Sequence, residues 1–277
     1  MRQLWQGFEA LHDVVYFTPA AQVAYAELGC RGWWMGYFAS RAAAVGPVGP
    51  EVVTALFFNF APRVVERALP DAWRLADRNA VLEARRRIAG AALRELLEVD
   101  AAELAHVLDA TARMVTAAPR SGRALFAATA ALPRPADPID ALWHDVTALR
   151  EFRGDGHVAA LVTAGLSGCA ANRLMFALGL VPPNQRERRG WTEQEWEQAL
   201  GDLLERGWLH ADGTPTREGR AAREEIEDRT DRLCEVATAA VGFDDLQAVT
   251  RTVVRLAQQV SRSGLIPYPN PTGVPAA

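Results

Sequence analysis

The chain has 277 residues, of which 49% are hydrophobic and 23% charged, and its formal net charge at pH 7 is −4. This is the composition of an ordinary globular protein, and its net charge gives no overall attraction for nucleic acid or acidic membranes. All 30 basic residues are arginine. The absence of lysine excludes the Schiff base of pyridoxal phosphate enzymes and the phosphate-binding lysine of a P-loop. We therefore expect no cofactor.

Several further absences bear on where the protein works. Every apolar stretch is interrupted by Arg, Glu, Gly or Pro before it reaches membrane-spanning length. The first residues, "MRQLWQGFEALHDVVYF", lack the apolar core and cleavage site of a signal peptide. Cys30, Cys169 and Cys234 lie too far apart to suggest a disulfide framework or a CxxC metal site. We expect a cytoplasmic protein without a membrane partner.

The first 135 residues predict a helical domain. Helical periodicity is clear over 80–98 and 101–117, where apolar residues recur on one face. Near the start, His12 and Tyr16 are four residues apart, which predicts a pair on one helix face. This domain also contains an aromatic-rich segment, "RGWWMGYFASRAAAVGPVGPE" (31–51).

The aromatic-rich segment has two interpretations. Large rings bury well, so most of them are expected in the core. However, Tyr37 and Arg41 share a helix face, Asn59 interrupts the apolar run "LFFNF", and buried polar groups need partners. Aromatic walls with a few convergent polar groups are typical of a small-molecule pocket. The candidate ligand-binding residues here are Trp33, Trp34, Tyr37, Phe38, Arg41 and Asn59.

The region 138–236 predicts a second, winged-helix domain, joined to the first across the loop "PRPADP". Helices are expected at 138–152, 156–165, 169–179, 192–206 and 217–236. Thr192 and Glu195 have the spacing of a capping box, Thr216 is a plausible helix cap, and Asp-Gly in "GWLHADGTPT" (207–216) indicates a β-hairpin. Helices followed by a hairpin and another helix are typical of a winged helix-turn-helix. The expected fold class is thus all-α with one small hairpin.

Residues 237–277 are expected to form a C-terminal helix, 244–262, followed by the Pro-rich tail "IPYPNPTGVPAA". The helix carries an apolar face. That face could form a homodimer interface, or it could pack on the N-terminal domain of the same chain.

The segment "LLERGWLHADGTPTREGRAAREEIE" resembles the corresponding part of MarR-type winged-helix proteins, a likeness covering about 80 residues. The whole chain is similar to a group of actinobacterial proteins identified as helix-turn-helix or MarR-like. The phrases that carry this likeness are "RGWWMGYFASRAAAVGPVGPEVV", "FFNFAP", "ALPDAW" and "RGDGHVAAL". The resemblance implies the fold, together with possible dimerisation through a terminal helix as in MarR-type proteins. It does not establish DNA binding or catalysis.

Charge disfavours DNA as a partner. In winged-helix proteins the second helix of the motif enters the major groove, and here that helix is 192–206. Over 190–212 one basic residue, Arg206, faces six acidic ones: Glu193, Glu195, Glu197, Asp202, Glu205 and Asp212. Because phosphate neutralisation supplies most non-specific affinity, an acidic recognition helix loses the main attraction.

The segment "LREFRGDGH" (149–157) is dense in ionisable residues. In one interpretation a helix ends near Phe152, Gly154 is its left-handed cap, and Asp155 caps the next helix. In another, Gly154 folds the chain back so that Asp155 and His157 approach Glu151. A pocket would then form with an acid–base pair, an arginine clamp for an anion, or a metal site, although no diagnostic metal spacing is present. The candidate catalytic residues are His144, Glu151, Asp155 and His157, and the candidate anion ligands are Arg150 and Arg153.

These observations favour a winged-helix-derived protein that binds an aromatic or anionic metabolite between its two domains. One alternative is a ligand-responsive, MarR-like DNA-binding regulator. Another is a cofactor-independent enzyme of secondary metabolism with His157 or His144 as general base.

Overall fold

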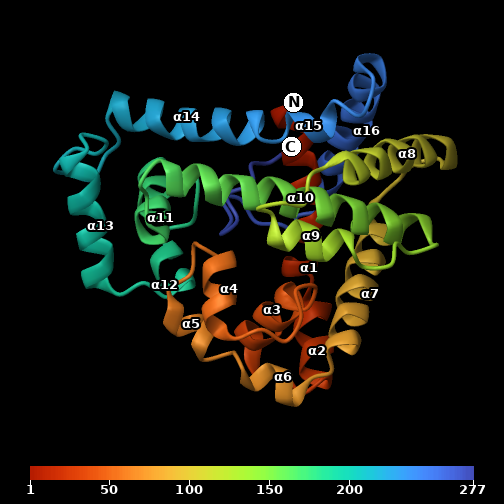
Figure 1. Cartoon of the computed structure of the whole chain (residues 1–277), viewed down its shortest axis with the longest axis horizontal. Helices are drawn as coiled ribbons and strands as arrows, with labels where there is room; N and C mark the ends of the chain where they lie inside the picture. The colour runs from red at the N-terminus through yellow and green to blue at the C-terminus, as the bar shows by residue number, and fades with distance from the viewer.

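The computed structural model describes residues 1–277 and contains sixteen α-helices and no β-strand (Figure 1). The helices are α1 (Arg2–Phe17), α2 (Pro19–Glu27), α3 (Gly32–Ala42), α4 (Pro50–Leu56), α5 (Pro62–Glu66), α6 (Asp71–Leu75), α7 (Arg78–Leu96), α8 (Ala101–Ala117), α9 (Ala124–Ala130), α10 (Pro138–Thr163), α11 (Gly168–Ala177), α12 (Gln185–Arg189), α13 (Glu193–Glu205), α14 (Arg217–Arg232), α15 (Glu235–Thr238) and α16 (Phe243–Arg262). No single helix is both long and apolar enough to cross a membrane; α10 and α11 reach that composition only together, across a 96° bend.

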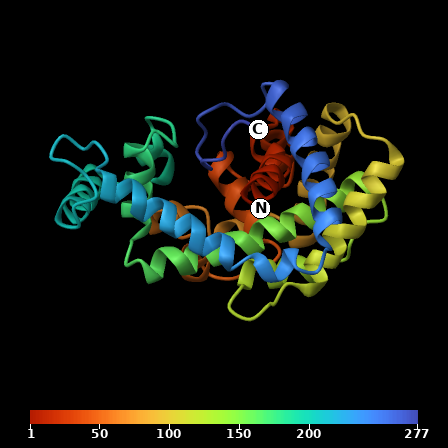
Figure 2. The ribbon, with the colours of Figure 1, turned by 90° about the horizontal axis from the view of Figure 1, so that it is seen from above.

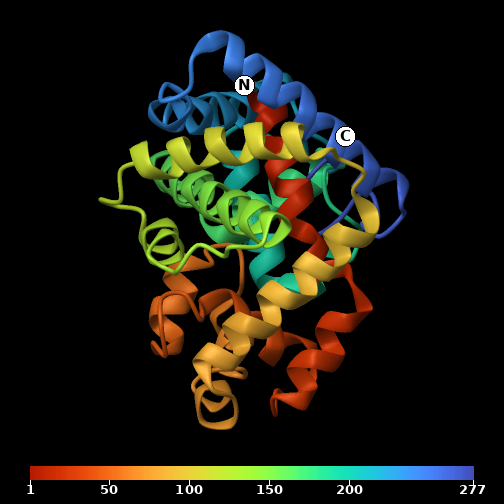
Figure 3. The same cartoon turned by 90° about the vertical axis from the view of Figure 1, so that its right-hand side faces the viewer.

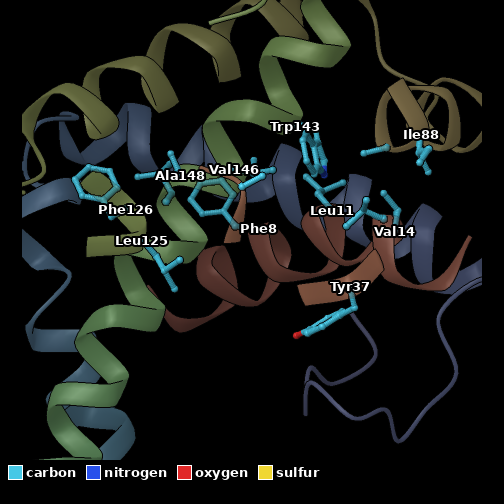
Figure 4. Close-up of a cluster of buried hydrophobic side chains, with 14 of the residues drawn as sticks. Phe8, Leu11, Val14, Tyr37, Ile88, Leu125, Phe126, Trp143, Val146 and Ala148 are labelled. Atoms are coloured by element: carbon cyan, nitrogen blue, oxygen red, sulfur yellow. The ribbon is translucent and has the colours of Figure 1, made fainter. Parts of the chain in front are cut away.

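The larger of two hydrophobic cores surrounds α1. It contains 51 buried residues and is built from α1 to α9, the first half of α10, and α15 and α16. In Figure 3, α1 runs through the middle of this group, with α7, α8 and α16 around it. Figure 4 shows Phe8, Leu11 and Val14 of α1 pointing toward Trp143 and Val146 of α10. The central helix is therefore covered by elements from both ends of the chain.

The smaller core contains 12 buried residues from the second half of α10 and from α11, α13 and α14. In Figure 2 this group lies at one end of the molecule, while α7 and α8 lie at the other. Residues of α10 up to Phe152 belong to the larger core, and those from Ala160 onward belong to the smaller one. The division between the cores thus lies within α10 rather than at the loop 133–138.

The interruption of α10 expected around Gly154 is wrong, because one helix runs from Pro138 to Thr163. Gly154 is helical and is not a left-handed cap. The second glycine, Gly156, allows a close approach: a Cβ there would lie 2.5 Å from Arg123 Nη1. The Arg123 guanidinium lies over the Phe152 ring, 3.8 Å from its centroid, and donates to the carbonyls of Phe152 and Leu233. Burial of this packed arginine offsets the cost of a mid-helix glycine.

Other helix predictions agree closely with the structure. The helix at 101–117 has the bounds of α8, and its N-cap Asp100 accepts from the backbone N–H groups of Ala102 and Glu103. The capping box between Thr192 and Glu195 is present at the start of α13, and the Thr216 side chain caps α14. These helices begin where local polar side chains satisfy otherwise unpaired backbone N–H groups.

The hairpin expected at 207–216 is reduced to a turn with one isolated β-bridge, between Leu209 and Pro215. The backbone N–H of His210 donates to Thr214 O over 2.8 Å, and that of Thr216 donates to Trp208 O over 3.0 Å. The turn connects α13 to α14 as a wing would, without forming strands.

The C-terminal helix packs within its own chain. Val249, Val253, Leu256 and Val260 of α16 are buried in the larger core, and Val253 lies directly against Gly7 of α1. Beyond α16, the tail runs back along the molecule. The Thr272 hydroxyl donates to Asp13 of α1 over 2.6 Å, while Pro271 O accepts from Gln185 and Arg189 of α12. The tail therefore connects α1 with the segment that leads into α13.

Candidate functional site

A cluster of charged side chains that includes the buried Arg85 and Glu151 borders a cavity of about 470 Å³, which we call the arginine cavity. Its walls come from α3, α7, α10 and the segment 129–137. The polar side chains on these walls are Ser40, Arg41, Asn79, Glu83, Arg85, Arg86, Thr129, Arg134, Asp137, His144, Thr147 and Glu151. The cavity has the size of a small-molecule site.

Arg85 of α7 is the unusual member of this wall because it is only 5% exposed and has no carboxylate partner. Its Nη2 donates to the Tyr16 hydroxyl over 2.9 Å, and its Nη1 donates to Ser40 Oγ over 3.3 Å. The guanidinium also faces the rings of Tyr16 and Trp143, 5.2 and 5.4 Å from their centroids. An arginine remains protonated in proteins, so the cavity wall contains a buried positive charge that forms no direct ion pair; the carboxylate that acts on it, Glu151, is bound by other arginines.

The other three arginines of the wall each face an acidic side chain. Arg41 contacts Glu151, with Nη2 3.3 Å from Oε2. Arg86 pairs with Asp140 and Glu83. Arg134 pairs with Asp145 over 2.7 Å. Arg85 is therefore the one arginine of the wall without a direct ion pair.

Glu151 of α10 lies at the cavity wall and pairs with two arginines. Arg41 binds it from α3, and Arg150 Nη1 donates to its Oε2 over 2.9 Å. Arg150 also pairs with Glu9 of α1 over 3.0 Å. Burial by itself raises the pKa of Glu151, but Arg41 and Arg150 outweigh it and lower the pKa to about 2. The carboxylate is ionised at neutral pH and holds two arginines in place.

A hydrogen-bonded chain of neutral groups lies behind the cavity. His12 Nδ1 is 3.0 Å from Thr147 Oγ1, and its Nε2 is 2.9 Å from the Tyr16 hydroxyl. Burial, together with the charges of Arg150, Arg85 and Arg41, holds the pKa of His12 well below its usual range. The predicted pair of His12 and Tyr16 thus exists. Through this pair a series of hydrogen bonds connects Thr147 of α10 with Arg85.

Burial and the neighbouring Glu9 raise the pKa of Asp13 well above its usual range. This carboxyl group is fully buried and accepts from the Thr272 hydroxyl, and its raised pKa disfavours the ionised form that would offset the arginines.

Part of the segment 149–157 reaches the aromatic-rich segment 31–51 through the contact between Arg41 and Glu151. His144 and Glu151, two helical turns apart, both line the arginine cavity as the helix period predicts. Burial lowers the pKa of His144, so the imidazole facing the cavity is neutral at pH 7. Arg150 lies behind the wall, between Glu9 and Glu151.

The remaining residues of that segment face other elements. Arg153 pairs with Glu227 and Asp231 of α14, and His157 Nδ1 is 2.9 Å from Thr230 Oγ1 of the same helix. Burial lowers the pKa of His157 to about 4. Asp155 accepts from Phe126 N at the start of α9 over 3.0 Å, and burial raises its pKa to about 6. Because α10 is continuous, the expected approach of Asp155 and His157 to Glu151 by a chain reversal at Gly154 is wrong.

The residues predicted to form an aromatic ligand pocket lie in different parts of the structure. Trp33, Trp34 and Tyr37 border a second cavity, of about 350 Å³. Phe38 is fully buried and packs on Phe57 and Phe60 in the core. Asn59 borders a space of only about 10 Å³ near His157; its backbone carbonyl accepts from Asn172, and its own Oδ1 is buried without a partner. Arg41 and Tyr37 do meet, with Arg41 Nη1 3.2 Å from the Tyr37 hydroxyl.

Sequence reasoning missed the arginine at the centre of the site. Arg85 lies in "LEARRRIAG", four residues after Val81 and three before Ile88, both of which are buried. It therefore occupies the apolar stripe of α7, while Arg87 points to solvent. A charged residue at an apolar position of the helical repeat was the available signal. Ser40 and Thr147 carried no such signal, because small hydroxyl residues are common on buried faces.

The smaller core contains the helix-turn-helix segment. The end of α10, then α11 and α13, follow one another in the expected order, with the short α12 between α11 and α13. Trp196, Ala199 and Leu203 face the core, whereas Glu193, Glu197, Asp202 and Glu205 are exposed. The solvent face of α13 is therefore acidic. No group of three or more His, Cys, Asp or Glu side chains is arranged to hold a metal ion.

A chain whose regular elements are all helices and which contains this segment has the architecture of a helix-turn-helix protein. A family model described as "Helix-turn-helix family" matches residues 1–267, and the chain belongs to that family. No curated protein and no solved structure matches the chain. The matched residues include both hydrophobic cores. The family model therefore describes the larger core as well as the helix-turn-helix segment.

Proposed function

We propose that this chain is a small-molecule-binding protein of winged-helix origin whose arginine cavity takes a small organic anion. The observation that carries the proposal is Arg85, a buried guanidinium on the wall of a 470 Å³ cavity that donates only to hydroxyls, faces aromatic rings and forms no ion pair. A buried charge without a counter-ion is costly, whereas a bound carboxylate or phosphate would balance it. The planar guanidinium is suited to bidentate recognition of such a group.

The surroundings of Arg85 support a ligand with a polar and an apolar part. Ser40, Thr147 and His144 offer hydrogen-bonding groups, and the Trp143 ring and Leu82 offer apolar surface. Glu151 is already engaged by two arginines, so it fixes Arg41 at the cavity and repels a second anion there. An anion would therefore be directed to Arg85 rather than to Arg41.

The first test is native mass spectrometry of the purified full chain beside the same sample denatured, which reveals a retained ligand and the oligomeric state together. The second is calorimetric titration with succinate and inorganic phosphate, with succinamide as the uncharged control. We expect binding of one of the anions and none of succinamide. R85Q should weaken that binding by at least about tenfold, the effect of losing a charge-assisted hydrogen bond.

Arg87 offers a matched control because it lies on the same helix and is exposed. R87Q should bind the anion as the wild type does. Equal binding by the wild type and R85Q, or equal loss in both variants, would overturn the assignment of the anion to Arg85.

The second candidate function is a ligand-responsive DNA-binding regulator, which the family supports because it includes the helix-turn-helix segment. The acidic solvent face of α13 opposes it. Duplex binding measured at 20 and 200 mM salt distinguishes the two candidates. Tight, salt-dependent binding that an anion relieves would establish the regulator, and absence of binding at 20 mM salt would leave the ligand-binding protein.

A further inference from the structure

A second cavity, separate from the arginine cavity, lies between α1, α3, α12 and the C-terminal tail; we call it the aromatic cavity. Its volume is about 350 Å³, and its aromatic walls are Tyr16, Phe17, Trp33, Trp34, Tyr37 and Phe60. The rings contact one another around it: Trp34 and Tyr37 are 5.7 Å apart between centroids, and Tyr37 and Phe60 are 5.5 Å apart. This wall presents several ring faces and edges to one space.

One side of the aromatic cavity is cationic. Arg189, at the end of α12, is 8% exposed, and its guanidinium lies 4.4 Å from the centroid of the Phe60 ring. Its hydrogen-bond partner is the carbonyl of Pro271 in the tail, and its Nε is buried without a partner. It forms no ion pair with a carboxylate. Arg188, at the same cavity, is exposed and donates only to Asn184.

No acidic side chain lines the aromatic cavity. The carboxyl group of Asp13 lies next to the tail, where Thr272 donates to it, but its pKa is raised by burial. Asp13 does not line the cavity, and it forms no ion pair with Arg189. Arg189 is left as a second buried guanidinium without a counter-ion, in a space lined by rings.

We propose that the aromatic cavity is a separate binding site for a planar aromatic monocarboxylate, with the carboxylate on Arg189 and the ring between Trp33, Trp34 and Tyr37. The rings provide apolar surface and edge-to-face contacts for an aromatic body, and the guanidinium provides the single charge-assisted contact. A second carboxylate has no cationic partner of comparable burial there. The site thus differs in chemistry from the arginine cavity, whose wall has few rings and many polar groups.

Hydrogen bonds of Tyr16 and Tyr37 connect the wall of the aromatic cavity with arginines of the arginine cavity. Tyr16 lines the aromatic cavity and accepts from Arg85 with its hydroxyl, and Tyr37 lines it and accepts from Arg41. The tail closes the aromatic cavity on the other side through Pro271 and Thr272. A ligand carboxylate at Arg189 would compete with the Pro271 carbonyl, so binding is expected to loosen the tail.

The test uses the full chain and 2-naphthoate as the probe, followed by calorimetry and tryptophan fluorescence. The comparison probes are cyclohexanecarboxylate, which has a carboxylate without an aromatic ring, and 2-naphthamide, which has the ring without the charge. We expect 2-naphthoate to bind and each comparison probe to bind at least about tenfold more weakly. Equal binding of all three, or none at millimolar concentration, would overturn the proposal.

Variants assign the site. R189Q should weaken 2-naphthoate by at least about tenfold, whereas R186Q, on the same helix and paired with Glu187 outside the cavity, should not. R85Q should weaken 2-naphthoate binding by less than R189Q does, because Arg85 contacts the aromatic cavity only through the Tyr16 hydroxyl. This comparison separates failure here from failure of the anion site at Arg85. Loss of 2-naphthoate in R85Q with retention in R189Q would move the aromatic acid to the arginine cavity and overturn the second site.

A second variant covers the case in which R189Q does not fold. Trp33 is partly exposed at the cavity, so W33L removes a ring without touching Arg189. We expect W33L to lose most of the preference for 2-naphthoate over cyclohexanecarboxylate. An unchanged preference in W33L would contradict the placement of the ring.

Discussion

Arg41 of α3 and Glu151 of α10 meet in the interior, with Nη2 3.3 Å from Oε2 and both side chains at least nine-tenths buried. Their contact joins the aromatic-rich segment to the polar segment of α10, which are 110 residues apart in sequence. Arg150 completes the group from the other side. Glu151 therefore balances the buried charges of both Arg41 and Arg150.

Replacing Glu151 by Gln should lower the free energy of unfolding by about 3 kcal/mol, because two buried guanidinium groups would lose their carboxylate. Urea denaturation followed by circular dichroism measures the change. E66Q is the control, since Glu66 is exposed and pairs with no arginine. A difference between the two variants below about 0.5 kcal/mol would contradict a stabilising role for Glu151.

Arg85 should behave in the opposite way. R85M removes a buried charge that has no carboxylate partner, so the unfolding free energy in anion-free buffer should stay within about 1 kcal/mol of the wild type. The wild type should gain about 2.7 kcal/mol from an anion at 100 times its Kd, and R85M should gain none. Equal stabilisation of both proteins by the anion would contradict anion binding by Arg85. A large loss of stability in R85M without the anion would show that Arg85 stabilises the fold.

His157 should make the protein sensitive to mild acid. Its pKa is about 4 in the folded protein because of burial, against an ordinary value of 6.5. Between pH 6.5 and pH 4 the unfolded chain therefore takes up a proton that the folded chain resists, and stability falls as the pH falls. Between pH 7 and pH 4 the wild type should lose about 3 kcal/mol more than H157Q, in which Gln retains a hydrogen bond to Thr230.

Urea denaturation at several pH values measures this difference. H210Q is the control because His210 is exposed. Parallel pH profiles for the wild type and H157Q would show that His157 does not cause the acid sensitivity.

Asp155 caps α9 from a neighbouring helix, by accepting from Phe126 N. D155A should cost about 1 kcal/mol, the usual value of a lost cap, while D155N keeps an acceptor and should retain most of that stability. Thermal unfolding of the two variants compares them directly. If D155N is as unstable as D155A, charge rather than capping is the contribution of Asp155.

Gly168 begins α11 against the segment 57–60, whose Phe57 and Phe60 belong to the larger core and whose Phe58 packs on the smaller one. A Cβ at Gly168 would collide with the carbonyl oxygen of Phe58. G168A should cost about 1–3 kcal/mol, because the two cores would have to separate locally. G201A, in the middle of α13 with open space around it, should be neutral or stabilising by up to about 1 kcal/mol. If G168A is as stable as the wild type, α11 can move away from Phe58 at little cost in free energy.

The sequence predicted local structure better than the site. Helix α8 and the capping box of α13 were predictable because their starts are set by Asp100, Thr192 and Glu195 within one helical turn. The continuity of α10 was not, because two glycines within three residues normally indicate a break. The reason for Gly156 is Arg123, which approaches from 33 positions earlier in the chain.

In the candidate site, too, some features could be predicted from the sequence and others could not. His144 and Glu151 follow from the helix period, and so does the contact between Tyr37 and Arg41. The pairing of Arg41 with Glu151, the separation of the aromatic rings from the arginine cavity, and the isolation of Arg85 depend on how α3, α7 and α10 pack. Such packing is decided by contacts between distant residues, which periodicity in one chain does not specify.

The contact of Gly7 in α1 with Val253 in α16 also has a consequence for biosynthesis. At 5–20 residues per second, α16 leaves the ribosome roughly 12 to 50 s after α1. During that time the apolar face of α1 lacks one of its main covers, while α7 and then α10 are synthesised and can pack on it. The larger core is therefore complete only once α16 has been synthesised, and until then the face of α1 that α16 covers lacks that contact.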